Sequence, residues 1–427
     1  MHIWRCLKKK LTEVKKLKIL HLNASDAGST GKIVLDICDE AIRRGYDCVS
    51  VFSKKTRASR SDIKEYSCSL PYEQGIYRRL SYVHGLHYGF APISTARILG
   101  ILRKEKPDVV HLHSINCAMV NIYRLLGYLK KHKISTVVTN HAEFFYTGSC
   151  PHALDCERWK TGCGKCPMLL YASESKMFDR THTAWCKMKK AFSGHERISV
   201  VSVSPWVYNR SISSPIMQNI PQSVILNGVN NCVFDYIPKE KARDALEISK
   251  NEKIILHVTA NFSDLESDSK GGRYLLELAR RFEGENVSIL VVGKHSTIEN
   301  LPTNITLTGS IKDQKKLALY YAAADITVVV SKRETFGMTV AESLCCGTPV
   351  VGFKSGGSES IAINEYSEFL PYDNVDSLES AIRNKWLDFK SEEAAVKISN
   401  AAKNAYSAKE MARKYCNLYE SMVGEDK

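Results

Sequence analysis

The stretch Ser331–Gly357 (SKRETFGMTVAESLCCGTPVVGFKSGG) constrains the fold of this chain more than any other part. It follows a short apolar run, Ile326–Val330, that is typical of a buried strand. Gly337 stands directly before a helical stretch, a Gly-Thr-Pro turn leads into another apolar run, and a double glycine closes the segment. This order of strand, loop, helix and strand predicts a parallel sheet covered by helices.

The same alternation of strands and helices runs along most of the chain. One hydrophobic core rarely serves more than about 250–300 residues, so the 427 residues predict two domains. We expect an α/β fold of two Rossmann-like domains with a cleft between them, and a chain join within the proline-punctuated stretch 204–224. The predicted division is 1–210 for the first domain, 211–400 for the second and 401–427 for a C-terminal helix that packs back toward the first.

Bulk properties narrow the partners and the compartment. The net charge of +14 indicates an anionic partner, such as nucleotide phosphates, an anionic membrane or nucleic acid. The N-terminus lacks the uninterrupted apolar core of a secretory signal, and the longest apolar runs are strand-sized, so we expect a cytoplasmic protein. In that compartment, the fourteen cysteines are better interpreted as thiols or metal ligands than as disulfides.

The residues around Gly337 point to a nucleotide site. Backbone N–H groups at the start of a helix can hold a diphosphate, aided by the helix dipole. Glu334 follows a predicted strand and Glu342 lies on the predicted helix, so both can face the crevice above the strand ends. An isolated pair of glutamates would more often be solvated, but the ordered glycine turns around this pair favour a binding site.

With these motifs, the chain resembles the family-4 (group 1) retaining glycosyltransferases of the two-domain B-type fold over nearly its whole length. The matching elements are Glu334-Thr335-Phe336-Gly337 with Glu342, Lys270-Gly271, Asn227-Gly228-Val229, the Gly28–Gly31 loop, and His141 after a strand. More narrowly, the cysteine-rich segment Thr147–Pro167 (TGSC…GCGKCP) is similar to a subgroup that builds bacterial surface polysaccharides.

The resemblance implies an activity and a division of labour. It implies transfer of a sugar, with retention, from a nucleotide-diphosphate sugar to a growing, lipid-linked exopolysaccharide, capsule or lipopolysaccharide glycan. The first domain would bind the acceptor and the second domain the donor. The leaving phosphate would help to take the acceptor's proton in a front-face attack, and no catalytic metal would be required.

The resemblance also assigns roles to single residues. Glu334, Lys270 and His141 would be the catalytic residues, with Glu334 holding donor-sugar hydroxyls and Lys270 neutralising the diphosphate. The nucleotide would be bound by Glu342 through its ribose and, near the phosphates, by Gly337, Phe336, Thr335, Gly31 and Asn261. The family often has an arginine where Asn261 stands, so the second phosphate cation is open, with Lys32 or Arg333 as replacements.

Two other histidines alternate on a predicted strand. His111 is expected to be a satisfied buried histidine, whereas His113, nearer the strand's end, could line the cleft or support the scaffold.

Four cysteines have a spacing that suits a metal. Cys150, Cys156, Cys163 and Cys166 form C-x5-C-x6-C-x2-C in a glycine-containing, loop-like segment. Four thiolates can bind structural zinc tetrahedrally, and the alternative is free or redox-active thiols.

The first eighteen residues favour a membrane surface. Trp4, Leu7, Leu11, Val14 and Leu17 recur at helical spacing among many lysines. A basic helix of this kind suits an anionic membrane, and the alternative is a solvated leader. We therefore expect a protein that is peripheral on the inner face of the membrane.

Two other functions compete with glycosyl transfer. A nucleotide-sugar 2-epimerase of similar fold would consume the donor without an acceptor. A zinc- and nucleic-acid-binding protein would fit the charge and the cysteines, but the basic residues are scattered without an aromatic-basic recognition pattern, so we expect no nucleic acid partner.

Overall fold

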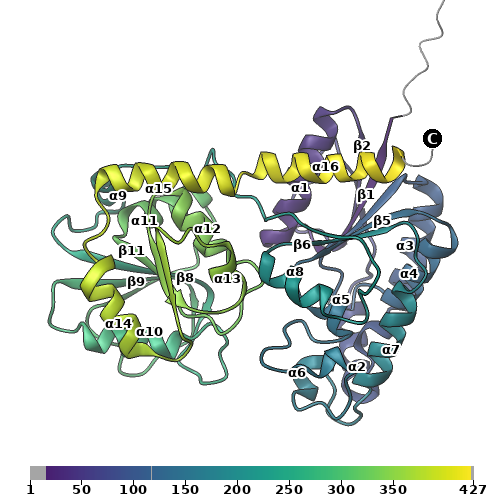
Figure 1. Cartoon of the computed structure of the whole chain (residues 1–427), viewed down its shortest axis with the longest axis horizontal. Coiled ribbons are helices and arrows are strands. Elements are labelled where there is room, and N and C mark those ends of the chain that lie inside the picture. The colour runs from purple at the N-terminus through teal and green to yellow at the C-terminus, as the bar shows by residue number, and fades with distance from the viewer. Residues whose placement is uncertain (1–15, 117, 425–427) are drawn as a thin grey trace, which may run out of the picture.

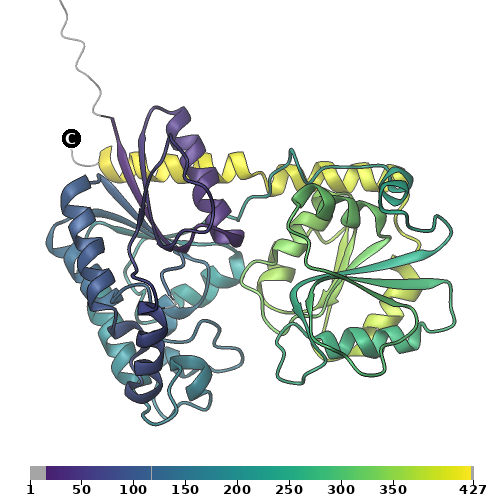
Figure 2. The same cartoon turned by 180° about the vertical axis from the view of Figure 1, so that it is seen from behind.

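The computed structural model describes residues 16–116 and 118–424, which form two α/β domains side by side (Figures 1 and 2). The first sheet is seven-stranded and parallel in the order β3-β2-β1-β4-β5-β6-β7. The second sheet is six-stranded and parallel in the order β10-β9-β8-β11-β12-β13. The predicted fold class is confirmed.

The strands of the first sheet are β1 Lys18–Ser25, β2 Asp47–Lys54, β3 Lys64–Ser67, β4 Val109–Leu112, β5 Ser135–Asn140, β6 Ile198–Ser202 and β7 Gln222–Val224. The strands of the second are β8 Lys253–Phe262, β9 Val287–His295, β10 Ile305–Gly309, β11 Ile326–Val329, β12 Val350–Phe353 and β13 Ser367–Leu370. The central strands β4, β5 and β11 are buried along their whole length, as expected of strands covered by helices on both faces.

The helices of the first domain are α1 Gly28–Arg43, α2 Glu73–His84, α3 Pro92–Glu105, α4 Ile122–Lys131, α5 Phe144–Thr147, α6 Leu169–Ser173, α7 Thr181–Phe192 and α8 Pro205–Ile212, with short 3-10 turns at His87–Gly89 and Arg158–Lys160. Those of the second are α9 Lys239–Leu246, α10 Gly272–Arg281, α11 Gln314–Ala323, α12 Met338–Cys345, α13 Gly357–Ile361, α14 Val375–Ala381, a π-helical turn at Ile382–Trp386, and α15 Glu392–Ala405. The last helix is α16, Ala408–Gly424.

The stretch 204–224, in which we expected the join, belongs to the first domain. Pro205 starts α8 instead of breaking the chain, because proline suits the first turn of a helix and the Ser204 hydroxyl caps it by accepting from Val207 N at 3.2 Å. After α8, β7 pairs with β6, so the first sheet extends to Val224, past the expected boundary at residue 210.

The C-terminal helix α16 crosses from the second domain to the first, where it lies along α1 (Figure 1). Its Tyr415 and Tyr419 are buried in the first domain. The Tyr419 hydroxyl is 2.6 Å from His111 Nδ1, and the Tyr415 hydroxyl is 3.0 Å from Thr139 Oγ1. The helix therefore ties the end of the chain to the core of the first sheet.

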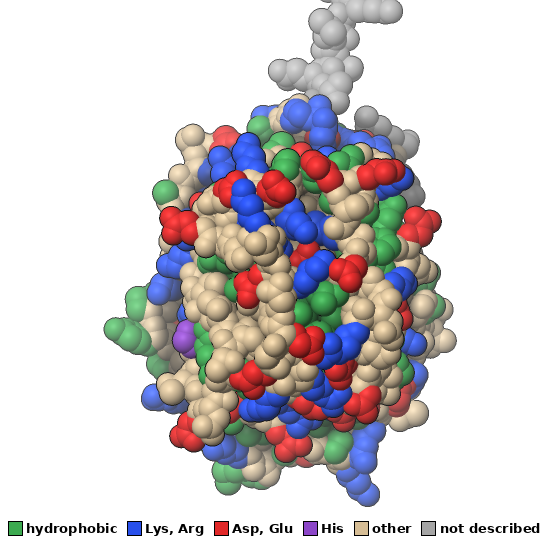
Figure 3. Space-filling model, turned by 90° about the vertical axis from the view of Figure 1, so that its left-hand side faces the viewer, with side chains coloured by type: hydrophobic (Ala, Val, Ile, Leu, Met, Phe, Trp, Pro, Cys, Tyr) green, Lys and Arg blue, Asp and Glu red, His purple; other side chains and the backbone are tan. Residues whose placement is uncertain are grey.

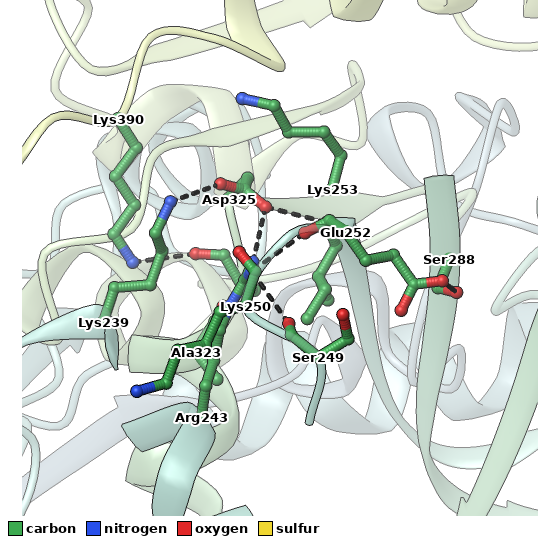
Figure 4. Close-up of polar contacts among 12 residues, drawn as sticks. Lys239, Arg243, Ser249, Lys250, Glu252, Lys253, Ser288, Ala323, Asp325 and Lys390 are labelled. Atoms are coloured by element: carbon green, nitrogen blue, oxygen red, sulfur yellow. Dashed lines mark hydrogen bonds and ion pairs between the residues drawn. The ribbon is translucent and has the colours of Figure 1, made fainter. Parts of the chain in front are cut away.

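A buried group of charges holds the second domain together at the edge away from the cleft (Figure 4). Asp325, just before β11, accepts from Arg243 Nη2 at 2.8 Å, from Lys239 Nζ at 2.9 Å and from the Ile254 amide at 2.7 Å. Lys390 Nζ donates to the carbonyl oxygens of Ala322 and Ala324, at the end of α11. These bonds fix α9 and α11 against the starts of β8 and β11, and so set the frame of the site at the other ends of those strands.

Candidate functional site

The candidate site lies between the domains, at the carboxyl ends of the strands. Strand order reverses between β1 and β4 in the first sheet and between β8 and β11 in the second. Open parallel sheets bind ligands at such reversal points. Ser29 follows β1, Lys270 follows β8 and Glu334 follows β11, and all three line one cavity between the domains.

This central cavity has a volume of about 320 Å³. The first domain contributes Ser29, Thr30 and His141, and the second contributes Lys270 and the Glu334–Thr339 loop. Of the predicted catalytic residues, Glu334, Lys270 and His141 are therefore brought together, and the predicted nucleotide-binding residues Thr335, Phe336 and Gly337 lie in the same wall.

Two helix N-termini, one from each domain, converge on the central cavity. Ala27 and Gly337, the residues before α1 and α12, make no side-chain cap, so within residues 16–116 and 118–424 the first amides of each helix have no cap partner. Residues of both first turns, Ser29 and Thr30 in α1 and Met338 and Thr339 in α12, line the cavity. Uncapped helix N-termini attract anions through their N–H groups and dipoles.

Gly337 is required at its position for two reasons. Its backbone is left-handed, with φ +93°, and a Cβ there would lie 2.7 Å from Ser358 Oγ. A larger residue would therefore displace the start of α12 from the cavity.

Lys270 supplies the positive charge inside the cavity. Its Nζ lies 2.7 Å from Glu334 Oε1, and both side chains remain partly exposed to the cleft. The two residues are 64 positions apart and meet because β8 and β11 are neighbours in the sheet.

A second, outer cavity of about 340 Å³ adjoins the first and contains Glu342, Lys32 and Gly28. Burial raises the pKa of Glu342 to about 7, while the hydrogen bond from Tyr321 and the charge of Lys32 act to lower it. The Tyr321 hydroxyl donates to Glu342 Oε2 at 3.0 Å. Met338 lines both cavities, so the start of α12 separates Glu342 from the Lys270–Glu334 pair.

His141 ends a series of three imidazoles that runs into the first domain. His141 Nε2 is 3.2 Å from His113 Nδ1, and His113 Nε2 is 3.1 Å from His21 Nδ1. Burial lowers the pKa of His141 to about 3, and it also lowers the pKa of His113. His141 is therefore a neutral hydrogen-bonding group, and His113 is part of the scaffold that orients it.

His111 packs against His113, with ring centroids 3.7 Å apart, but its hydrogen bonds go to other partners. Its two ring nitrogens contact the Tyr419 hydroxyl and Thr139 Oγ1, so it is a satisfied buried histidine as expected.

Three of the expected contributors lie elsewhere. Asn261 is exposed on β8 and does not line either cleft cavity. Arg333, one of the two possible replacements for the missing cation, pairs with Asp155 of the cysteine-rich segment at 3.0 Å. The other possible replacement, Lys32, does line the outer cavity. Gly31 is buried behind the cavity wall, and a Cβ there would meet the Asp26 carbonyl carbon at 2.7 Å, so this glycine allows α1 to start close to the preceding turn.

Thr335 connects the two domains directly. Its Oγ1 donates to the His141 carbonyl oxygen at 2.8 Å, and its own carbonyl oxygen accepts from Ser204 Oγ at 2.6 Å. The loop that carries Glu334 is thereby held against the end of β5 and the start of α8.

The cysteine-rich segment folds around a buried tryptophan. Trp159 Nε1 donates to the Cys156 carbonyl oxygen at 2.8 Å, and Trp185 Nε1 donates to the Trp159 carbonyl oxygen at 2.7 Å. Among the described residues, the groups of three or more metal-ligating side chains whose ligand atoms lie within 4.8 Å of one another are His21-Cys38-Cys48 and His21-His111-His113, and neither includes the four predicted zinc ligands. As placed, these thiols do not form a metal site, and zinc remains a prediction.

Two histidines near the site have no counterpart in the sequence-based prediction. His257 lies in the middle of β8 and lines the central cavity, and its buried Nε2 has no hydrogen-bond partner among the described residues. The signal in the sequence that could have identified His257 is a polar residue inside the apolar run IILHV. His152, in the cysteine-rich segment, has a buried Nδ1 for which the described part of the chain offers no hydrogen-bond partner. Burial lowers the pKa of His152, and Glu334 and Lys270 are near enough to act on this pKa in opposite directions.

Residues 238–405 match the glycosyl transferases group 1 family, and residues 30–230 match glycosyltransferase family 4. The Escherichia coli (strain K12) protein named "Putative colanic acid biosynthesis glycosyl transferase WcaC" is 22% identical over 331 residues, which cover 75% of this chain and 78% of that protein. Sucrose-phosphate synthase from Thermosynechococcus elongatus has a similar structure, with a TM-score of 0.70, 17% identity and coverage of 96% of this chain and 100% of that one. Anabaena HepE in complex with UDP has a TM-score of 0.62 at 15% identity, covering 95% and 100%.

Proposed function

The chain is a glycosyltransferase, with a family 4 domain followed by a group 1 domain, and we propose that it transfers a sugar from a nucleoside-diphosphate sugar to a growing bacterial surface glycan. The observation that carries the donor assignment is the convergence of two uncapped helix N-termini and Lys270 on one cavity. A diphosphate is the part of a sugar nucleotide that such a site favours. The similarity to a protein named for colanic acid biosynthesis supports a surface glycan as the product.

The two cavities suggest how the donor lies. In our proposal the diphosphate occupies the central cavity beside Lys270, and the ribose reaches the outer cavity, where Glu342 accepts hydrogen bonds from its hydroxyls. The sugar then lies by Glu334 and His141, which face each other across the cleft from different domains. Lys32, beside Glu342, is the cation that we assign to the outer side of the diphosphate.

The proposed reaction retains the configuration of the transferred sugar. The acceptor hydroxyl attacks the anomeric carbon from the face that the phosphate leaves, and the leaving phosphate oxygen takes the hydroxyl proton. Lys270 and the amides of the two helix starts stabilise the charge that grows on the diphosphate. In this proposal these groups have the electrostatic role that a divalent cation has in other phosphate chemistry, so no catalytic metal is required.

The acceptor side is proposed to lie in the first domain, with the acceptor linked to lipid. Its wall includes the cysteine-rich segment, because Asp155 reaches Arg333, next to Glu334. Among the described residues, no helix is long and apolar enough to cross a bilayer. A lipid-linked acceptor would then be met from the membrane surface.

A thermal-shift panel of nucleoside diphosphates tests the donor assignment. We expect one base to raise the Tm, since a ligand at 100 times its Kd stabilises the native state by about 2.7 kcal/mol. Lys270→Met should remove most of this shift, and Lys397→Met, at an exposed lysine on α15, should retain it. No shift with any nucleoside diphosphate would contradict the proposal.

Incubation of the matching sugar nucleotide then separates transfer from epimerisation. Glycosyl transfer requires an added acceptor, and NMR of the product should show the anomeric configuration of the donor. Conversion of the sugar nucleotide to an isomer without an acceptor would favour the epimerase instead.

A further inference from the structure

Helix α2 exposes an apolar stripe, while two of its three buried residues are polar. Ile76, Leu80 and Val83 are spaced by four and three residues and all face solvent, whereas the buried positions are Glu73, Tyr77 and Ser81. A surface helix of a globular protein normally has the opposite arrangement. The sequence of α2 therefore suits a medium other than water on its outer side.

The exposed apolar side chains gather in one region of the first domain. Of the fifteen large hydrophobic side chains that the described residues expose, five lie in 70–83 and four in 170–178. Tyr72 is 89% exposed and Met177 is 65% exposed, so these are protruding side chains rather than core edges. We call this set the apolar face; its members are Leu70, Tyr72, Ile76, Leu80, Val83, Leu170, Tyr171, Met177 and Phe178.

The two segments form a continuous surface. α2 packs against α6, and the Lys176 amide donates to the Tyr82 carbonyl oxygen at 3.0 Å. A Cβ at Gly85, which ends α2, would lie 2.2 Å from the Phe178 carbonyl oxygen. Both views place α2 and α6 together at the end of the first domain opposite α16 (Figures 1 and 2).

Cations border the apolar face, and the acids near it are engaged. Arg79, Lys165 and Lys176 are exposed. Glu73 accepts from the Leu70 and Ser94 amides, Glu174 pairs with Arg78 at 3.5 Å, and Asp179 accepts from the Cys166 and Thr181 amides. These acids keep their charge, but Glu73 is buried and Glu174 pairs with Arg78. The exposed Arg79, Lys165 and Lys176 therefore outnumber the exposed Asp179, and the net outward-facing charge around the apolar side chains is positive. The outer end of the second domain, by contrast, carries both signs intermixed (Figure 3).

We propose that the apolar face docks on an anionic lipid bilayer. Protruding aliphatic and aromatic side chains with basic residues at their border suit the boundary between headgroups and acyl chains. A second copy of this chain fits less well, because a twofold contact pairs this face with itself and would bring two positively bordered surfaces together. An anionic bilayer complements both features, because its acyl chains are apolar and its headgroups are negatively charged.

The position of the face connects it to the proposed transfer reaction, and this step rests on the proposed function. Along the chain, α6 and Met177 follow the cysteine-rich segment directly. That segment contacts the donor side through the pair between Asp155 and Arg333. Docking through α2 and α6 would place the acceptor side of the cleft near the lipid surface, where a lipid-linked glycan presents its growing end.

Sedimentation of the full chain with vesicles tests the proposal. We expect binding to phosphatidylcholine vesicles that contain phosphatidylglycerol, weaker binding to pure phosphatidylcholine, and weakening by salt. The variant Ile76→Ser/Leu80→Ser/Phe178→Ser should lower the partition coefficient about tenfold or more. Arg79→Glu/Lys176→Glu should lower it on the anionic vesicles and change little on the neutral ones.

A matched control uses exposed leucines of the second domain. Leu265→Ser/Leu301→Ser removes side chains that are 63% and 37% exposed there, and it should leave vesicle binding unchanged. All variants should keep the nucleotide-induced Tm shift, which reports the proposed donor site and is independent of the vesicles. If the wild type showed no nucleotide-induced Tm shift, that result would count against the donor assignment and not against the docking proposal.

Three results would overturn the docking proposal. The first is that the triple serine variant binds vesicles as strongly as the wild type does. The second is loss of binding only on deletion of Met1–Glu13, which would assign attachment to the N-terminus. The third is a wild-type dimer in analytical ultracentrifugation that the triple variant dissociates, which would make the apolar face a contact between copies.

Discussion

Lys270 and Glu334 form an ion pair in the second-domain wall of the central cavity, with Lys270 Nζ 2.7 Å from Glu334 Oε1. The two groups that we assign to the diphosphate and to the donor sugar are therefore partners of each other. A diphosphate that takes the charge of Lys270 must share it with Glu334 or release Glu334 toward the sugar.

This pair predicts that neutralising Glu334 separates binding from turnover. Glu334→Gln frees Lys270 from its partner, so affinity for the free nucleoside diphosphate should stay equal or rise a few-fold. Turnover of the intact donor should fall about tenfold to a hundredfold, because a hydrogen bond to a charged group contributes roughly 1.5–3 kcal/mol. Calorimetry and steady-state kinetics measure the two quantities, and Glu365→Gln, at an exposed position, is the control. Unchanged kcat would contradict the role of Glu334.

Glu342 should contribute to nucleotide binding, and its burial should lower the stability of the folded protein when no nucleotide is bound. Glu342→Gln should weaken nucleoside diphosphate binding by about one to two powers of ten if the carboxylate accepts the ribose hydroxyls. Equal affinity in calorimetry would place the ribose elsewhere.

The same substitution should change how stability depends on pH. Because burial raises the pKa of Glu342 to about 7 from its usual 4.5, the folded protein holds this proton more tightly than the unfolded chain. The stability linked to the proton is present below pH 4.5 and is lost as the pH rises to about 7. Glu342→Gln lacks this loss, so relative to wild type it should gain about 1–3 kcal/mol between pH 5 and pH 8. Melting curves at both pH values measure the difference, and a pH-independent difference would contradict the raised pKa.

Thr335 should control closure of the cleft. Thr335→Val removes the hydrogen bond to the His141 carbonyl oxygen, which contributes about 1 kcal/mol, so the open form should gain about fivefold in population. Small-angle scattering should show a larger radius of gyration, and the KM for the donor should rise. Thr308→Val, which removes a hydroxyl bonded within the second domain, should change neither quantity. An unchanged radius for Thr335→Val would show that other contacts hold the domains together.

The cysteine-rich segment is expected to bind one zinc per chain. Binding would have to draw the four thiols together, and it should raise the Tm, because a metal bound only by the folded protein stabilises it. Elemental analysis should find about one zinc in the wild type and much less in Cys163→Ser, while Cys232→Ser, at an exposed cysteine, should retain it. A wild type that contains no zinc and is as stable as Cys163→Ser would contradict the zinc prediction. Aromatic packing alone would then hold the segment together.

The elements with strong apolar periodicity were predictable from the sequence. Strand β4 and helix α4 are examples, because a short apolar run and a regular apolar stripe each allow one interpretation. The short edge strands β3 and β7 were missed, since an edge strand exposes much of its surface and loses the apolar signal. Helix α2 was missed as a feature because its apolar side faces outward, and no pattern of sequence says which side will be covered. The tether predicted for the first residues stays a prediction for Trp4, Leu7, Leu11 and Val14, which lie outside the described residues. For Leu17 the prediction is wrong, because Leu17 is not helical and is buried in the core of the first domain.

By itself, the sequence determined where the helices α8 and α12 beside the cleft begin, because Gly337 acts through its own backbone and Ser204 through a hydroxyl that caps the turn that follows. Only the tertiary structure decided which distant groups meet. Lys270 contacts Glu334 because β8 and β11 are neighbours, His257 joins the cavity from inside β8, and Arg333 turns to Asp155 of the other domain. The reason is physical: turns and caps depend on a few adjacent residues, whereas these contacts depend on strand order and on how two separately formed sheets face each other across the cleft.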